Sequence, residues 1–301
     1  MPGRRGNGPS NPGREGSVHL TAIRGPASGR TAKMTVEAES LPRTFSVGLE
    51  GVVYTLVDVH EGHDARFEDW YENDHFYAGG TLGPHVLSGR RWYASKALRE
   101  GRFVSAEVPF PDPYAGTNLA TYFLTTGGLQ HFYEWVVPQL GVLRAGGRMF
   151  ADRTHVNTDG YRLENILRFP GASAVPAHVV GDHPFAGLFV CYADASGPGA
   201  PDDSAALPPG TLAISLRPNA GSLTTESLGL ATTQLGMELP SVGGQPVRLI
   251  MAFLADAPDA SPQWAAELAS KTAQLTGSRA IWGGAFLPVV PGSRAHLSQL
   301  R

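Results

Sequence analysis

The segment that decides the fold reads FEDWYENDH and runs from Phe67 to His75. Its large apolar residues, Phe67, Trp70 and Tyr71, stand at positions i, i+3 and i+4, which is the spacing of one helix face. Asp64 precedes this stripe and is predicted to cap the N-terminus of the helix. The sequence therefore predicts an amphipathic helix from Asp64 to His75, about three turns long.

Strand patterns flank this helix on both sides. The stretch before it, Gly51 to Val59, is rich in β-branched and aromatic residues and predicts a buried strand. Gly79-Gly80 and Gly83-Pro84 follow the helix and are predicted to break it. A second strand is predicted from Val86 to Ser95, and a long proline-rich connection follows it.

A second helix completes a six-element pattern. A third strand is predicted from Asn118 to Thr125, and Gly127-Gly128 introduces a helix whose apolar residues share one stripe. Pro138 lies inside this helix and predicts a kink. A fourth strand is predicted to begin near Met149 and to run through His155. The order β-α-β-β-α-β is the signature of a ferredoxin-like unit.

A similar pattern returns after a bridge rich in proline and glycine. Residues 196–210 occupy the place of its first helix, but prolines surround the few helix formers there, so at most one turn is expected. The second half is therefore predicted to be degenerate, and a site should occur once, in the first half. Residues 221–240 are interpreted as a short helix or a loop insertion. The other predicted elements are strands at 188–193, 211–216, 247–255 and 280–289 and a helix at 262–276.

Charge and composition define the organisation of the chain. Residues 1–33 hold six of the 24 basic side chains and one of the 27 acidic ones. Because the whole chain has a net charge of −3, residues 34–301 carry a clear excess of acidic side chains. An acidic body argues against a nucleic-acid partner. Residues 1–33 are rich in glycine, proline and serine and are predicted to be disordered, and Met34 is an alternative start. We thus predict an α+β protein with a basic tail at 1–45, a ferredoxin-like half at 46–170, a linker at 171–186 and a degenerate ferredoxin-like half at 187–301.

Composition indicates a soluble globular protein. Hydrophobic residues make up 42% and charged residues 17% of the chain, and no run approaches the roughly eighteen apolar residues of a membrane-spanning helix. Cys191 is the single cysteine, so no disulfide can form within the chain, and its apolar surroundings predict a buried side chain without a catalytic role. We therefore expect a cytoplasmic location and no membrane partner.

His75 and Asp74 are the strongest candidates for chemistry. On the predicted helix, His75 lies four residues beyond Tyr71, and Asp74 lies four beyond Trp70. The helix C-terminus and the nearby carboxylate predict a raised pKa for His75, which suits a proton donor. Phe67, Trp70 and Tyr71 would form walls for a flat hydrophobic substrate. Two alternatives stay open, because a histidine at a helix end also serves as a C-cap and aromatic residues at helical spacing are common in cores.

A resemblance to a known superfamily favours function. The stretch from Tyr54 to Tyr93 resembles the EthD-like and muconolactone-isomerase-like dimeric α+β barrel proteins. The resemblance lies in the pattern Phe67-x-x-Trp70-Tyr71-x-x-Asp74-His75, followed by Gly83-Pro84 and Arg90-Arg91-Trp92-Tyr93. The resemblance implies that the two fused halves form one barrel within the chain, with a further homodimer possible. It also places His75 where EthD-like proteins and methylmuconolactone-type isomerases keep a site histidine. The first half has no cysteine, and Phe76-Tyr77 replaces a proline that commonly follows the histidine, so lactone isomerisation is not favoured.

Four further residues are candidates for substrate binding because their strands could direct them inward. Arg91 and Tyr93 lie on the second predicted strand, Tyr122 on the third and His155 on the fourth, where His155 should share a face with Asn157. The motif His60-Glu-Gly-His63 has a metal-like spacing but no further ligands, so no metal site is expected. The paired glycines lack the spacing of a nucleotide-binding loop.

These observations predict a cofactor-independent enzyme that acts on a small hydrophobic aromatic or polyketide-like carbonyl compound. His75 would transfer a proton, assisted by Asp74 and by Tyr71 or Tyr93, in an isomerase, cyclase, dehydratase or lyase reaction. One alternative is a haem-dependent or oxygen-dependent oxidoreductase of the same fold, with His75 or His155 as the iron ligand. Another is a non-catalytic binding or accessory protein, which an isolated His75 packed against aromatic rings would favour.

Overall fold

The computed structural model of the protein describes residues 47–197, 199–202, 204–219, 240–242 and 245–301. The chain divides into two units, residues 1–44 and 45–301, and all that follows concerns the second unit. The predicted basic tail at 1–45 lies outside the described residues. So does the predicted helix or loop at 221–240, except for Pro240.

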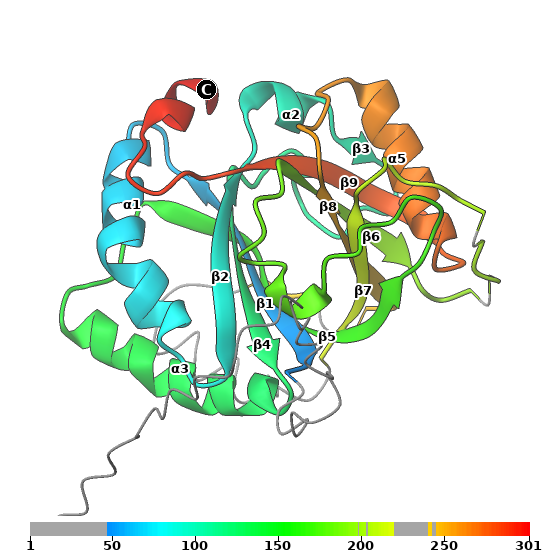
Figure 1. The fold of residues 1–301 in the computed structure, drawn as a ribbon. Coiled ribbons are helices and arrows are strands. Elements are labelled where there is room, and N and C mark those ends of the chain that lie inside the picture. The colour runs from blue at the N-terminus through cyan, green and yellow to red at the C-terminus, as the bar shows by residue number, and fades with distance from the viewer. Residues whose placement is uncertain (1–46, 198, 203, 220–239, 243–244) are drawn as a thin grey trace, which may run out of the picture. The chain divides into compact units, whose positions relative to one another are not determined.

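Eight antiparallel strands form a closed barrel in the described part of the chain. They follow the order β2-β4-β1-β5-β7-β8-β6-β9, and β9 pairs back to β2, while the short β3 extends from β9. The ring closes through Trp92 opposite Pro288 and Tyr93 opposite Leu287. The protein is therefore of the α+β class, with a barrel that both halves of the chain share (Figure 1). The strands are β1 (Leu49–Val59), β2 (Val86–Tyr93), β3 (Phe103–Val104), β4 (Asn118–Thr125), β5 (Arg153–Leu167), β6 (Gly187–Asp194), β7 (Leu212–Pro218), β8 (Val247–Leu254) and β9 (Arg279–Pro288).

The two halves contribute four strands each, in the same spatial order. In the first half the order is β2-β4-β1-β5, and in the second it is β7-β8-β6-β9, so in both the first strand along the chain lies between the third and the fourth. This agreement confirms the sequence prediction that a similar pattern of strands returns after residue 186. The two quartets join where β5 pairs with β7 and where β2 pairs with β9.

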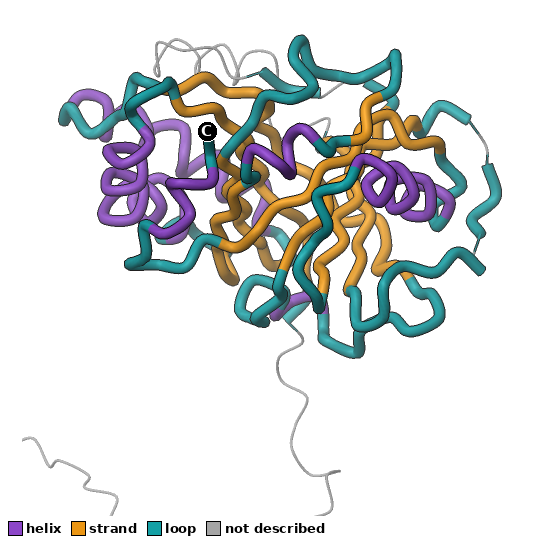
Figure 2. Tube along the Cα trace, turned by 90° about the horizontal axis from the view of Figure 1, so that it is seen from above, coloured by secondary structure: helices purple, strands orange, loops and turns teal. Residues whose placement is uncertain are grey.

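Helices are distributed unequally between the halves. Between β6 and β7 the described residues contain no helix, as the prolines of that segment predict, whereas the first half has a long helical segment between β1 and β2. Helical segments lie at both sides of the group of strands when viewed from above (Figure 2). They are α1 (Asp64–Trp70), η1 (Tyr71–His75), η2 (Tyr77–Thr81), α2 (Lys96–Glu100), α3 (Gly128–Ala145), η3 (Ala177–Val179), α5 (Pro262–Gln274) and η4 (Ala295–Gln299).

The structure corrects three local predictions. His63, not Asp64, is the N-cap of α1, and its side chain makes no capping hydrogen bond. The proline-rich connection contains α2, which Ser95 caps by accepting a hydrogen bond from the Leu98 amide. The fourth strand begins at Arg153 and not near Met149, because its pairing with β1 starts only where Arg153 lies opposite Val59.

The barrel interior is filled with side chains and is not a pore. On β1, Val52, Tyr54 and Leu56 belong to a large apolar cluster that includes residues of both halves. The alternate residues Val53 and Val57 belong to a second cluster, which joins the outer face of the sheet to helices α1 and α3. Because a strand directs alternate side chains to opposite faces, helices cover the outer face of the first half. Among the described residues, no helix combines the length and the apolar character needed to cross a bilayer.

Candidate functional site

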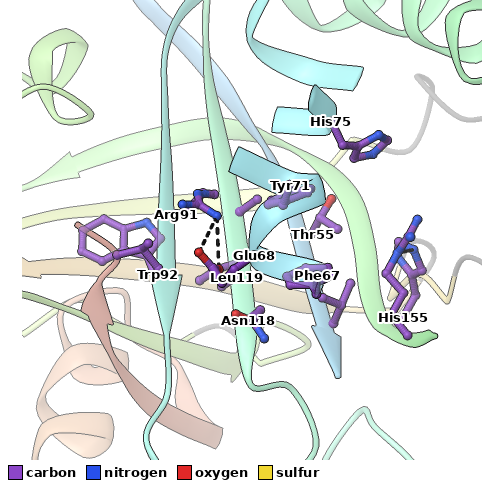
Figure 3. A pocket seen from close by; sticks show the side chains of 14 residues that line it. Thr55, Phe67, Glu68, Tyr71, His75, Arg91, Trp92, Asn118, Leu119 and His155 are labelled. Atoms are coloured by element: carbon purple, nitrogen blue, oxygen red, sulfur yellow. Dashed lines mark hydrogen bonds and ion pairs between the residues drawn. The ribbon is translucent and has the colours of Figure 1, made fainter. Parts of the chain in front are cut away.

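A cavity lies between the helical segment α1–η1 and the outer face of the sheet in the first half (Figure 3). It has two neighbouring compartments, of about 30 Å³ and about 90 Å³. The residues that line both compartments come from β1, η1 and β5, which are far apart in the sequence. They are Thr55, Tyr71, His75, Arg153 and His155. The prediction that Arg91, Tyr93, Tyr122 and His155 point into the barrel is wrong, because strand pairing places all four on the outer face of the sheet.

A change in helical period positions His75. From Tyr71 to His75 the helix takes the π form, and a second π-helical stretch continues from Tyr77 to Thr81. A π-helix brings residues i and i+5 into contact, and the His75 ring stacks on Trp70 at 4.2 Å between centroids. Tyr71, four residues before His75, lies farther away at 5.5 Å. The helix thus extends beyond the predicted end, and His75 aligns with Trp70 more closely than with Tyr71.

Two glycines inside the second π-helical stretch make space for the site. A Cβ atom at Gly79 would lie 2.7 Å from Cε1 of His75, and one at Gly80 would lie 2.2 Å from Cε1 of Tyr122. The prediction that Gly79 and Gly80 break the helix is therefore wrong, because both lie inside a helical stretch. They allow the backbone to approach the His75 and Tyr122 rings.

Replacing Gly80 by alanine is expected to destabilise the fold. The new methyl group would overlap the Tyr122 ring, which packs between the rings of Phe76 and Phe132. We expect the free energy of unfolding to fall by about 1–3 kcal/mol in urea denaturation, even though alanine favours helices. Gly197→Ala is the control, because a Cβ there meets no heavy atom within 4 Å. Equal stabilities of the two variants would show that Tyr122 moves freely and would refute this packing.

The environment of His75 favours the neutral imidazole. Burial, reinforced by the positive charge of Arg153, lowers the pKa of His75 to about 3, and the opposing effect of Asp74 is smaller. The prediction of a raised pKa is therefore wrong, because it considered the helix end and the adjacent carboxylate but not the loss of water around the ring. At neutral pH His75 is a proton acceptor.

Asp74 faces away from the cavity. Its carboxylate accepts hydrogen bonds from Arg148, at 3.0 Å from Nε and also from Nη2, and it lines neither compartment. These bonds hold the pKa of Asp74 below its usual value. The predicted pairing of Asp74 with His75 in proton transfer finds no support in this geometry.

His75 has an unused hydrogen-bonding atom. Nδ1 of its ring is buried, and no described residue offers it a hydrogen-bond partner. A buried polar atom without a partner costs free energy, so such an atom beside a cavity is a candidate for ligand contact. The His75 ring stacks on Trp70 and has no described hydrogen-bond partner at Nδ1. This is the arrangement expected for a non-catalytic binding protein.

Two tyrosines supply hydroxyl groups to the larger compartment. The hydroxyls of Tyr71 and Tyr122 lie 3.1 Å apart and form a hydrogen bond. Burial raises the pKa of both, so each remains a protonated donor at neutral pH. Phe67 stacks on Tyr71 at 5.2 Å and lines the smaller compartment. Trp70 lines neither compartment and supports the back of His75, while its Nε1 donates to the carbonyl of Arg148 at 2.7 Å.

Strand β5 adds a polar group that the sequence interpretation missed. Nε of Arg153 donates to Nε2 of His155 at 3.3 Å, which leaves Nδ1 of His155 to donate to the Thr158 hydroxyl at 2.7 Å. Burial lowers the pKa of Arg153 to about 10, so it stays charged at neutral pH. Burial, with the charge of Arg153, lowers the pKa of His155 to about 3. The sequence contained one signal for Arg153: it lies two residues before His155 on a predicted strand, so both should face the same side.

A β-bulge separates His155 from Asn157. His155 lies opposite Val57 and Asn157 opposite Leu56, so Val156 is skipped in the pairing with β1. Residues two apart then face opposite sides of the sheet. Asn157 points into the barrel, where its amide donates to the hydroxyls of Tyr161 and Tyr192, each at 2.7 Å. The prediction that His155 and Asn157 share a face is therefore wrong.

Arg91 lines the smaller compartment, where its guanidinium forms an ion pair with Glu68. Its Nη1 donates to both carboxylate oxygens of Glu68, at 3.2 and 3.0 Å, as Figure 3 shows. Tyr93 lines neither compartment. Its ring packs on His296 at 4.9 Å, and its hydroxyl donates to Gln299 at 3.2 Å.

An outer groove adjoins the polar end of the cavity. It has a volume of about 510 Å³, and Arg153 and His155 line it together with residues of the β3–β4 connection. These two side chains therefore lie between the groove and the inner compartments. The other residues that line the groove are Pro111, Asp112, Ala115, Thr154, Val156 and Pro240.

Other sequence candidates take part in ordinary contacts. Nδ1 of His63 lies 3.1 Å from the Asp152 carboxylate, and His60 forms a hydrogen bond with the Thr154 hydroxyl. Within the described ranges, no three His, Cys, Asp or Glu side chains are arranged to hold a metal ion. Cys191 is buried, which raises the pKa of its thiol and makes it unreactive.

Comparisons with known proteins give a likeness at low identity. Neither a protein-family model nor a curated protein matches the chain. Among solved structures, the chain is similar to one described as a candidate chlorite dismutase, with 12% sequence identity and a TM-score of 0.42. The match covers 81% of this chain and 96% of that one.

Proposed function

We propose that this protein binds a small hydrophobic carbonyl compound in the cavity beside His75 and catalyses proton transfer on it without a cofactor. The observation that carries the proposal is that one compartment is lined by a neutral imidazole, His75, together with polar groups able to stabilise negative charge. The cavity also holds the Tyr71 and Tyr122 hydroxyls and the Arg153 guanidinium. An acid–base reaction of the isomerase, cyclase, dehydratase or lyase type requires such a set of groups.

The expected roles follow from the protonation states. Neutral His75 accepts a proton from a carbon next to the substrate carbonyl. The oxygen then gains negative charge, which the hydroxyl pair of Tyr71 and Tyr122 stabilises. The same negative charge opposes the effects of burial and of Arg153 on His75, and so raises the pKa of its imidazole in the complex. Asp74 has no part in this scheme.

Exchange of carbon-bound hydrogen tests this function without knowledge of the natural substrate. The full chain is incubated in D₂O with a panel of small ketones, aldehydes and unsaturated acids, and loss of the signal from hydrogens next to the carbonyl is followed by NMR. We expect exchange with at least one compound, and a decrease of about 10²–10⁴ in its rate in His75→Gln, the range for loss of a positioned acid or base.

The control is His131→Gln, which replaces an exposed histidine of α3. Its exchange rate should equal that of the unaltered protein. A loss below tenfold in His75→Gln would remove His75 from the role of base. Exchange with no compound of the panel would count against the enzymatic proposal as a whole.

Haem bound at His75 does not fit the inner compartments. These compartments, about 30 and 90 Å³, are far smaller than the roughly 300–1,000 Å³ of pockets that hold drug-sized ligands. A porphyrin is at least as large as such ligands. His155 also lines the outer groove of about 510 Å³, so the size argument concerns His75 alone as the iron ligand. The His75 ring also lies against Trp70 and the backbone of Gly79, so a macrocycle would have to displace the helix.

A non-catalytic binding protein is the second candidate function. The lack of any hydrogen-bond partner for Nδ1 of His75 favours it, because no other described side chain prepares the imidazole for proton transfer. In this case the ligand would bind in the same cavity, and His75 would donate or accept one hydrogen bond. Saturable binding without exchange of carbon-bound hydrogen would establish this alternative.

We also infer the finer classification from the topology. The shared strand order supports two ferredoxin-like halves of the dimeric α+β barrel type, and the helical segment that carries His75 after the first strand supports the EthD-like resemblance. A single-chain barrel does not require a partner subunit, so a homodimer stays a possibility to be tested by the molar mass in solution. A cytoplasmic location is part of the same proposal.

A further inference from the structure

We infer that the ligand of this cavity is a small monocarboxylic acid whose carboxylate binds at Arg153 and whose apolar ring or chain lies against helix α3. The inference rests on the proposed function for the location of the site and adds the chemical class of the ligand. It depends on the uneven distribution of polar and apolar side chains around the larger compartment.

The polar end of the compartment is formed by β5. Arg153, His155 and Thr158 all line it, and hydrogen bonds from Arg153 to His155 and from His155 to Thr158 fix their orientations. The Arg153 guanidinium packs over the Trp70 ring at 4.7 Å, and it also donates to the carbonyl of Phe150. A guanidinium in a fixed position presents a planar set of donors that matches a carboxylate.

The formal charge at this end of the larger compartment is positive. Among the described side chains that line the larger compartment, Arg153 carries a formal charge and none is acidic. The charge of Arg153 contributes to the lowered pKa values of His75 and His155 and opposes the rise that burial causes in the pKa of Tyr71, so it acts on the whole polar end. An anion is therefore favoured there over a neutral group of the same shape.

The opposite end is apolar and small. Helix α3 supplies most of this wall, and Val53 of β1 and Met149 complete it. At about 90 Å³ the compartment is smaller than an engineered cavity of about 150 Å³ that holds benzene, so a single ring or a short chain is the upper limit after modest adjustment. The wall residues from α3 are Phe132, Tyr133, Val136, Val137 and Leu140.

The outer groove indicates the orientation of the ligand. Arg153 and His155 line both the groove and the inner compartments, whereas the α3 residues line only the larger inner one. A ligand that enters through the groove with its apolar end first would leave its carboxylate beside Arg153. Recognition of charge and exclusion by size would then occur at opposite ends of the cavity.

A pair of isosteric probes tests the carboxylate. Benzoate and benzamide have nearly the same shape but differ in charge, and their binding to the full chain is measured by NMR titration. We expect benzoate to bind at least tenfold more tightly than benzamide. In Arg153→Met this ratio should fall to about one, while Arg162→Met, a control on the same strand, should preserve it. Benzamide that binds as tightly as benzoate, or no binding of either at millimolar concentration, would overturn the inference.

A second variant tests the apolar end independently of Arg153. Leu140→Ala enlarges the wall and is expected to raise the affinity for 2-naphthoate at least tenfold while changing that for benzoate less than threefold. An unchanged affinity for 2-naphthoate would show that the ring does not reach α3. If Arg153→Met fails to fold, the ratio in the unaltered protein and the Leu140→Ala result still decide the question.

The results separate this inference from the proposed function. Binding of benzoate that depends on Arg153, without hydrogen exchange on any carbonyl compound, would contradict catalysis but support the carboxylate site. Exchange that depends on His75, with benzamide bound as tightly as benzoate, would contradict the carboxylate site and support catalysis.

Discussion

Acidification from pH 7 to pH 5 is expected to destabilise this protein through two buried histidines. The folded-state pKa of His75 and of His155 is about 3, against a reference value of 6.5. Between these values the unfolded chain binds a proton on each histidine and the folded chain does not. The free energy of unfolding therefore falls as the pH decreases through this window. At pH 5 the expected loss is about 2 kcal/mol for each histidine.

The measurement is urea denaturation at several pH values between 7 and 5, on the unaltered protein and on the double variant His75→Gln/His155→Gln. Glutamine does not titrate, so the double variant should lose about 4 kcal/mol less over this interval. The exposed His131→Gln variant is the control and should follow the unaltered protein. Parallel pH profiles for the double variant and the unaltered protein would mean that the two histidines charge freely in the folded state.

Removing the Glu68 carboxylate is expected to cost about 3–5 kcal/mol of stability, as for other buried ion pairs that lose one partner. Glu68 and Arg91 are 2% and 7% exposed, and they meet at 3.0 Å beneath helix α1. Nε2 of His296, from the C-terminal segment, lies 3.6 Å from the same carboxylate. Glu68→Ala leaves Arg91 buried, with Glu72 at 3.6 Å as its remaining acidic partner among the described residues. The loss would be measured as a shift of the urea midpoint.

Two further variants distinguish an uncompensated charge from a simple loss of packing. The double variant Glu68→Leu/Arg91→Met replaces both charges by apolar groups and should recover most of the lost stability. Glu267→Ala breaks an exposed pair with Lys271 on α5 and should leave the urea midpoint nearly unchanged. If the double variant is as unstable as Glu68→Ala, packing around Glu68 and not its charge accounts for the effect.

The network around Glu68 also connects the C-terminal segment to the site helix. Arg294 binds Glu72 at 2.5 Å and Asp69 at 2.7 Å, and Arg301 binds Asp64 at 2.8 Å. Figure 1 shows this segment beside α1. Because α1 continues directly into the turn that carries His75, these contacts hold the position of the imidazole. The sequence alone did not indicate that residues 292–301 support the site.

Elements with strong local periodicity were predicted well. Strand β4, at Asn118–Thr125, and strand β8, at Val247–Leu254, lie where alternating or continuous apolar residues predicted them, and helix α5 begins at Pro262 as predicted. The described residues between β6 and β7 contain no helix, as the prolines there predicted. These features depend on the preferences of neighbouring residues, which the sequence contains directly.

Elements that depend on pairing with distant strands were predicted less well. The beginning of β5 at Arg153 is set by the end of β1, and the skipped residue Val156 changes which face His155 occupies. Helix α2 lies in a stretch whose prolines suggested an irregular connection. No local pattern contains the information on which strands lie side by side.

The sequence by itself determined that a helix with Phe67, Trp70, Tyr71 and His75 on its inner side follows the first strand, because side-chain spacing along one helix is a local property. Only the tertiary structure decided what His75 can do. The π-helical turn stacks it on Trp70, and Arg148, 74 positions further along the chain, binds Asp74. Arg153 of β5 adds a positive charge near the buried imidazole ring. Protonation depends on desolvation and on charges brought together by folding, so the same histidine that the helix end alone would make a proton donor becomes a neutral acceptor.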